Sequence, residues 1–277
     1  MQIVMERKLT IKDVMDYYLA HYANSMPNGS NGIVTMWSEM NEIKSYYKEC
    51  VSNQSGCYSF DEVIRMCVRG LYTTGHQKRV DEQAINMAVS NLMTGKFTDF
   101  RTGKNCSLLN KRTISFYKYF VDFEELYDAV LQLIGNITGI GYVTLYDTAR
   151  RIGYLLNQPI FPVAYVYLHY NCVNKAAQSI LRRRLAYREP ATSFLCEFCA
   201  FPSICIEDIL CIFSDVFIKV LNTKNDSDET ISKSVNNNWR DMPLKEFLEK
   251  EDKRFKDRKN SQRWPEFENT KIYAYKK

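Results

Sequence analysis

Residues 136–153, NITGIGYVTLYDTARRIG, contain the residue types and spacing best suited to binding chemistry. Gly139 and Gly141 can adopt positive φ or a close backbone approach without a Cβ penalty, so a tight turn between two helices is expected. Ile140 between them is expected to point inward and hold the two helices together. The first turn of the following helix, at Tyr142, Val143 and Thr144, would then present backbone N–H groups that suit a phosphate oxygen.

The net charge of the chain, +5, is concentrated in the segment that begins at this turn. Residues 139–190 contain seven basic and two acidic side chains, which accounts for the entire excess. The basic residues are Arg150, Arg151, Lys175, Arg182, Arg183, Arg184 and Arg188. Localised positive charge is typical of a phosphate-binding face, so Arg150, Arg151, Lys175, Arg182 and Arg183 are predicted to assist the turn.

The turn resembles the helix-hairpin-helix motif of DNA-binding and DNA-repair proteins, whose pattern is hydrophobic-x-Gly-hydrophobic-Gly-x-x-Thr/Ala. Ile137, Gly139, Ile140, Gly141 and Thr144 match that pattern. The resemblance covers residues 136–153 and implies contact with the DNA backbone without base reading. Leu145 and Thr148 depart from it, because a small and an apolar residue are usual at those two positions.

The same motif gives the chain a remote resemblance to the helical DNA glycosylases. Members of that superfamily place a catalytic Asp about twenty residues beyond the motif, and the bifunctional members have a Lys within it. Here Tyr142 and Val143 stand where that Lys would lie, and the downstream stretch FPVAYVYLHYNCV contains no carboxylate. His169 in that stretch cannot replace a carboxylate that stabilises an oxocarbenium-like state. Glycosylase chemistry is therefore not expected.

Both features have simpler explanations. A Gly-x-Gly turn also joins two packed helices for packing reasons alone, and LRRRLAYRE (181–189) also suits a solvated helix face. Three consecutive arginines on a helix would fan over ~200°, so they would not all reach one ligand.

No other residue set indicates a catalytic, metal or cofactor site. Cys196, Cys199, Cys205 and Cys211 lack the paired-knuckle spacing of a structural zinc site and lie in an apolar region, so buried thiols are the better interpretation. The histidines, His21, His76 and His169, are widely separated in the sequence.

The elements that must position the turn are mostly helical. Hydrophobic periodicity predicts helices within residues 10–23, 33–51, 59–72, 80–93, 122–137 and 144–156, then an irregular start and a long helix over 163–187, and one apolar core helix over 205–221. Residues 94–114 are expected to form loops. The predicted fold class is mainly α, a multi-helix globular domain that contains a helix-hairpin-helix element.

Domain boundaries follow from composition. We expect one helical domain over residues 1–221, divisible into lobes 1–115 and 116–221, then a polar linker over 222–242 and a charged helix with a tail over 243–277. No apolar run reaches the ~18 residues of a membrane helix, and the charged N-terminus does not suit a signal peptide, so no membrane partner and a cytoplasmic location are expected.

These observations favour a non-catalytic DNA-binding or DNA-associated protein. The first alternative is a helical scaffold that binds an acidic protein through its basic residues, with the turn as a structural joint. The second is a nucleic-acid-processing enzyme whose catalytic group the sequence does not reveal.

Overall fold

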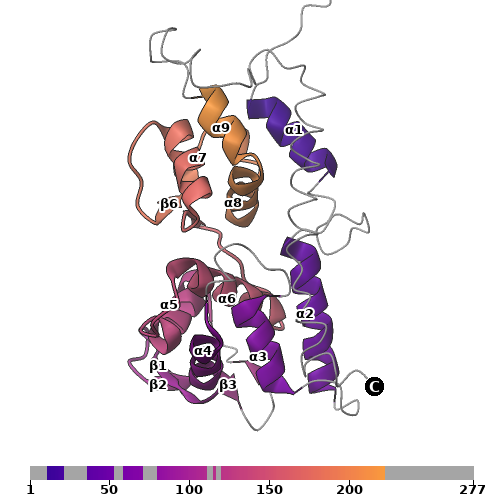
Figure 1. Cartoon of the computed structure of the whole chain (residues 1–277), viewed down its shortest axis with the longest axis vertical. Helices are drawn as coiled ribbons and strands as arrows, with labels where there is room; N and C mark the ends of the chain where they lie inside the picture. Colours follow the sequence, from indigo (N-terminus) through magenta and orange to yellow (C-terminus); the bar gives the residue numbers. More distant parts are fainter. Residues whose placement is uncertain are drawn as a thin grey trace, which may run out of the picture. The chain divides into compact units, whose positions relative to one another are not determined.

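The computed structural model describes residues 11–21, 36–52, 59–70, 80–110, 115–116 and 120–221. Helices α1 to α9 dominate this part of the chain, and the described strands form three small antiparallel pairs (Figure 1). The mainly α prediction is confirmed. None of the described helices is both long and apolar enough to cross a membrane.

The described residues form two compact units, one of which is discontinuous in sequence. One contains residues 36–162. The other contains α1 (Ile11–His21) and residues 163–221. The chain therefore divides at other places than the expected lobes 1–115 and 116–221, because α1 packs with the later segment. The predicted linker 222–242 and charged helix 243–277 lie outside the described residues.

The unit of residues 36–162 is built around a buried helix. Its helices are α2 (Met36–Val51), α3 (Phe60–Arg69), α4 (Glu82–Thr94), α5 (Phe123–Ile134) and α6 (Tyr142–Leu155). From Thr144 to Leu155 every residue of α6 is buried, and α2, α3 and α5 all pack against it. Leu145, Ala149 and Ile152 contribute to this core as the periodicity predicts. A helix buried all round is typical of the centre of a domain.

Local capping explains where several of these helices begin. Ser59 and Glu62 form a capping box at the start of α3. Asp81 accepts a hydrogen bond from the Ala84 N–H at the start of α4, and Asp122 does the same for Glu125 at α5. Each carboxylate or hydroxyl satisfies an N–H that the helix itself leaves without a partner.

The segment expected to be loop, 94–114, contains strands. β1 (Lys96–Thr98) pairs with β2 (Asn105–Ser107), and β3 (Leu109–Asn110) pairs with β4 (Ser115–Phe116). A turn held by Gly103 at φ +65° and by the Asp99 backbone connects β1 and β2. Three-residue strands carry too short an alternation to be detected by periodicity. Phe97 and Leu109 pack this hairpin region into the unit.

In the other unit, α7 (Asn171–Leu181) packs against α8 (Ser203–Ile212) and α9 (Ser214–Leu221), and α1 contacts the segment just before α8. β5 (Tyr165–Tyr167) precedes α7, and β6 (Arg188–Pro190), which follows α7, pairs antiparallel with β5. Two 3-10 helices, η3 (Ala191–Ser193) and η4 (Cys196–Phe198), lead into α8. Of the long helix predicted over 163–187, only the central part, Asn171–Leu181, is therefore helical.

The predicted apolar helix over 205–221 is interrupted. Phe213, at φ −101° and ψ 22°, separates α8 from α9. Both helices are buried as expected, but α8 also buries Glu207 and Asp208. The Tyr18 hydroxyl on α1 donates a hydrogen bond to Asp208 at 3.1 Å. This contact links α1 to the later segment and helps to explain why the unit is discontinuous in sequence.

Candidate functional site

The turn between α5 and α6, residues 135–141, has a backbone geometry that requires one of its glycines. The Ile137 N–H donates to the Ile134 carbonyl at 3.2 Å, and the Ile140 N–H donates to the Ile137 carbonyl at 3.0 Å. Gly139 has φ +94°, a conformation that L side chains rarely adopt. Ile137 and Ile140 are buried, so their side chains anchor the turn to the core of the unit.

Gly141 is the N-cap of α6 and has extended backbone, φ −95° and ψ 171°. The helical hydrogen-bond ladder starts with the Leu145 N–H, which donates to the Gly141 carbonyl at 3.0 Å. No side chain caps this helix, whereas aspartates cap α4 and α5. Within the described residues, the amides of Val143 and Thr144 stand at the positive end of a 14-residue helix whose first turn contains no acidic side chain.

The surroundings of the turn are not basic. Residues 135–146 contain no Lys or Arg. A Cβ at Gly139 would lie 3.6 Å from the Cβ of Ala84, in the first turn of α4, and Asp81 and Glu82 begin that helix. Glu82 is in turn bound by Arg65 and Arg69. Among the described residues around the turn, attraction of phosphate would therefore come mainly from backbone N–H groups.

Arg150 and Arg151 occupy a different position from the one predicted. They are 6% and 2% exposed, inside the unit, where carboxylates already hold them. Arg150 Nη2 lies 3.0 Å from Asp147 Oδ1, and its guanidinium lies over the Tyr146 ring. The prediction that these two arginines contact phosphate is corrected here: their charge is neutralised within the fold, so they support α6 and do not present charge to a ligand.

Arg151 connects three helices. Its Nε and Nη2 lie 3.2 and 3.1 Å from Glu39 Oε2 on α2, and its Nη1 donates to the Cys67 carbonyl on α3 at 3.0 Å. Asp147 Oδ2, one helical turn earlier on α6, lies 3.9 Å from Arg151 Nη2. Charged groups this deeply buried persist only when they are paired and hydrogen-bonded. We call Glu39, Asp147, Arg150 and Arg151 the buried charge cluster.

The backbone beside this cluster leaves room for the guanidinium. Gly70, which follows α3, has φ +75°, and a Cβ there would lie 2.6 Å from Arg151 Nη2 and 2.8 Å from Glu39 Oε1. Burial raises the pKa of the Cys67 thiol to about 12, and nearby Glu39 adds to the rise. Cys67 is therefore a protonated structural thiol and not a nucleophile.

Lys175, Arg182 and Arg183 belong to the unit that contains α7, whereas the turn belongs to the unit of residues 36–162. Lys175 and Arg182 are exposed. Arg183 is bound to Glu189 through contacts of 3.2 and 2.6 Å. The arginine run does not continue a helix as expected, because α7 ends at Leu181 and Arg182 adopts a left-handed conformation, φ 52° and ψ 36°.

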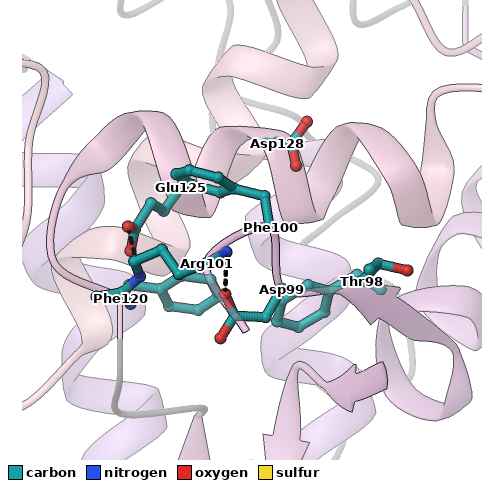
Figure 2. Close-up of a pocket in the computed structure, with 8 residues that line it drawn as sticks. Thr98, Asp99, Phe100, Arg101, Phe120, Glu125 and Asp128 are labelled. Carbon is teal, nitrogen blue, oxygen red and sulfur yellow. Dashed lines mark hydrogen bonds and ion pairs between the residues drawn. The ribbon is translucent and has the colours of Figure 1, made fainter. Parts of the chain in front are cut away.

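A small hollow in the unit of residues 36–162 contains charged side chains (Figure 2). Arg101 spans it, with Nε 2.9 Å from Glu125 Oε1, while its backbone N–H donates to Asp99 Oδ1 at 2.9 Å. The hollow has a free volume of about 10 Å³ and holds no more than one water molecule. These residues stabilise the β1–β2 turn against α5 and do not form a substrate site.

A larger hollow of about 330 Å³ lies in the same unit. It is lined by aromatic, aliphatic and amide side chains, at Tyr47, Phe116, Phe120, Val121, Leu156, Asn157, Gln158 and Ile160. Tyr47 is the titratable group among them, and burial raises its pKa. The described residues of this lining include no acid–base pair or nucleophile, and their side chains are suited to apolar contact.

The cysteines at the start of α8 do not converge. Cys196 and Cys199 are exposed at η4, whereas Cys205 is buried. Within the described residues, no three His, Cys, Asp or Glu side chains gather closely enough to hold a metal ion.

Comparison of the chain with protein-family models, with curated proteins and with solved structures finds no match.

Sequence reasoning missed the buried charge cluster. A signal for it exists, because Asp147 precedes Arg150 and Arg151 by three and four residues on a helix that is otherwise apolar. Side chains at these spacings share one helix face and form ion pairs. The partner on α2, Glu39, has no such sequence signal, because it is over a hundred residues away.

Proposed function

We propose that this chain is a non-catalytic nucleic-acid-binding protein that contacts the phosphate backbone of duplex DNA through the α5–α6 turn. The observation that supports it is the start of α6: Gly141 caps the helix without a side chain, next to Gly139 at φ +94°. This combination resembles the helix-hairpin-helix motif, in which backbone N–H groups bind a phosphate oxygen.

In this proposal each residue of the turn has a distinct role. The amides of Val143 and Thr144 bind the phosphate, and the absence of a Cβ at Gly139 and Gly141 lets the backbone approach. Ile140 holds the turn to the unit, while Tyr142, 60% exposed, lies beside the approaching strand. Lys175 and Arg182, exposed in the other unit, add positive charge that attracts DNA to the protein.

Substitution of Gly141 tests the proposal without disturbing the fold. A Cβ at Gly141 meets no atom within 4 Å, and its φ is accessible to all residues. Gly141→Asp places an anion over the N-terminal amides, so we expect duplex binding to weaken about tenfold or more, while the stability of the protein stays equal or rises by up to ~0.5 kcal/mol. Fluorescence anisotropy with a labelled duplex at two salt concentrations measures the first effect, and urea denaturation the second.

Gly141→Asn is the matched control, because it caps the same amides without a negative charge. Binding should decrease in the order Gly, Asn, Asp, and wild-type binding should weaken steeply with salt. Equal binding by all three proteins would contradict the proposal and leave the turn as a structural joint.

The second candidate function is a helical protein-interaction module. The observation that favours it is exposed apolar surface in the unit of residues 36–162, at Val121 (67% exposed) beside the larger hollow and at Phe100 (69% exposed) beside the smaller one. Val121→Asp would then abolish a stable protein complex detected by size-exclusion chromatography and would leave duplex binding unchanged.

The third interpretation, an enzyme, would need a carboxylate that is available to substrate. Asp147 is buried in α6 not far beyond the turn, but it is bound by Arg150 and Arg151. We therefore assign it a structural role.

A further inference from the structure

The unit containing α7 carries a stack of aromatic rings and a guanidinium at its two-stranded sheet. The guanidinium carbon of Arg188 on β6 lies 4.5 Å from the ring centre of Tyr165 on β5 and 5.5 Å from that of Tyr187. The His169 and Tyr187 rings are parallel to within 4°, with centres 5.5 Å apart. Tyr167, buried, lies under His169 at 5.6 Å.

This stack is partly open to solvent. Tyr187 is 47% exposed, and Tyr165, His169 and Arg188 are each half-buried. The stack is held in place by its neighbours, so little side-chain entropy would be lost when a further planar group is added.

The loop that carries Tyr187 is itself fixed. The Leu168 N–H donates to the Tyr187 carbonyl at 2.7 Å, and the Asn174 side chain on α7 donates to the Ala186 carbonyl at 3.3 Å. Arg183 binds Glu189, whose side chain is buried. The loop is therefore held to α7 through Asn174, and the next residue of that helix, Lys175, is exposed.

The charge of this region is nearly all of one sign. Between residues 163 and 190 the only acidic residue is Glu189, and Arg183 already occupies it. Exposed cations remain at Lys175, Arg182 and Arg184. Within residues 163–190, aromatic rings and exposed cations occur without an exposed carboxylate, and this combination matches the chemistry of unpaired nucleotides, which present both flat bases and phosphates.

We propose that these residues form a binding surface for single-stranded nucleic acid, separate from the α5–α6 turn. We call it the aromatic-basic surface; its members are Tyr165, His169, Lys175, Arg182, Arg184, Tyr187 and Arg188. Unpaired bases stack on the ring and guanidinium planes, and Lys175, Arg182 and Arg184 bind the phosphates. This goes beyond the proposed duplex contact, because a duplex keeps its bases stacked inside and cannot use the rings.

The cations alone would also attract an acidic protein segment. Such a partner has no planar bases, so it would leave the exposed ring of Tyr187 unused. The ring stack is therefore the feature that favours single-stranded nucleic acid, and the experiment must measure the contribution of the bases.

The test uses the full chain and three fluorescein-labelled probes: a 15-nucleotide oligo(dT), an abasic oligonucleotide of the same length, and a duplex of 15 base pairs. We expect oligo(dT) to bind about tenfold more tightly than the abasic strand, because both carry the same phosphates and only one carries bases. Tyr187→Ala should remove most of that difference, whereas Tyr187→Phe should retain it.

Matched controls come from the other unit. Phe100→Ala removes an aromatic ring that is more exposed than that of Tyr187, and Lys96→Gln removes an exposed cation; neither should change oligo(dT) binding. Arg182→Gln with Arg184→Gln alters only exposed side chains and should weaken oligo(dT) and the abasic strand by the same factor. Thermal melting followed by circular dichroism verifies that each variant is folded.

Equal binding of oligo(dT) and the abasic strand, equal effects of Tyr187→Ala and Phe100→Ala, or displacement of oligo(dT) by poly-glutamate at the same charge concentration would each overturn the proposal. The two proposals fail separately. Gly141→Asp reports on the duplex contact, and Tyr187→Ala reports on the aromatic-basic surface; loss of either effect leaves the other proposal standing.

Discussion

The two arginine runs of the chain, Arg150–Arg151 and Arg182–Arg184, have the same local composition and opposite roles. Arg150 and Arg151 lie inside the buried helix α6, bound to Asp147 and Glu39. The later run follows the end of α7, where Arg182 and Arg184 are exposed. The difference arises because the helix continues through Arg150 and Arg151 but ends before Arg182. The helix α6 is central and has Asp147 one turn before its arginines, so these cations are buried and paired. The helix α7 ends at Leu181, so Arg182 and Arg184 extend into solvent.

The comparison also shows what a local excess of positive charge does and does not indicate. The excess in residues 139–190 suggests a single basic face. Two of its seven cations are neutralised in the core of one unit, and a third, Arg183, is bound to Glu189. The exposed positive charge of residues 139–190 therefore belongs mainly to the unit that contains α7.

The strongest way to test this contrast is to remove a buried cation. Arg151→Met leaves Glu39 in the interior without its cation, and we expect the free energy of unfolding to fall by about 3–5 kcal/mol. Arg182→Gln, at the exposed run, should change it by less than ~0.5 kcal/mol. Urea denaturation followed by circular dichroism measures both.

The double variant Glu39→Gln with Arg151→Met separates burial from pairing. It removes both charges, so most of the lost stability should return. If the double variant is as unstable as Arg151→Met alone, the cost lies in packing, and the charge cluster is not what stabilises the contact of α2 with α6.

A second test uses two glycines with similar positive φ and different surroundings. Gly70→Ala combines strain at φ +75° with a clash against Arg151 and Glu39, so we expect a loss of about 2–4 kcal/mol. Gly103→Ala has φ +65° and open space around its Cβ, so backbone strain alone should cost about 1 kcal/mol. Equal losses in thermal or urea denaturation would show that Gly70 does not make room for the cluster.

The smallest effect concerns the exposed run. Arg182 caps α7 in a left-handed conformation that glycine adopts more readily. Arg182→Gly should therefore raise the free energy of unfolding by up to ~1 kcal/mol, while oligo(dT) binding becomes weaker and less dependent on salt. Arg182→Gln should weaken binding to the same extent without the gain in stability. A stabilised variant with unchanged binding would show that Arg182 is only a helix terminus.

The prediction from sequence succeeded where local rules decide the outcome. The 3.6-residue periodicity predicted α2 to α6 with small boundary errors, and Ser59, Asp81 and Asp122 signal the starts of their helices. The tight turn at Gly139 also follows from local backbone freedom. Lys175 and Arg182 were predicted as cations that assist the turn, but the ring stack of Tyr165, His169 and Tyr187 was not predicted, because it depends on the pairing of β5 with β6.

The sequence by itself determined the mainly α class, the glycine turn before α6 and the positions of most helices, because these depend on side chains within a few residues of one another. Tertiary structure alone decided that α1 joins the later segment through Asp208, that Glu39 neutralises Arg151, and that the arginine run after Leu181 leaves the helix. Each of these outcomes depends on a partner distant in sequence or on where a helix stops. A cation takes part in binding or in structure according to the partner that the fold brings to it.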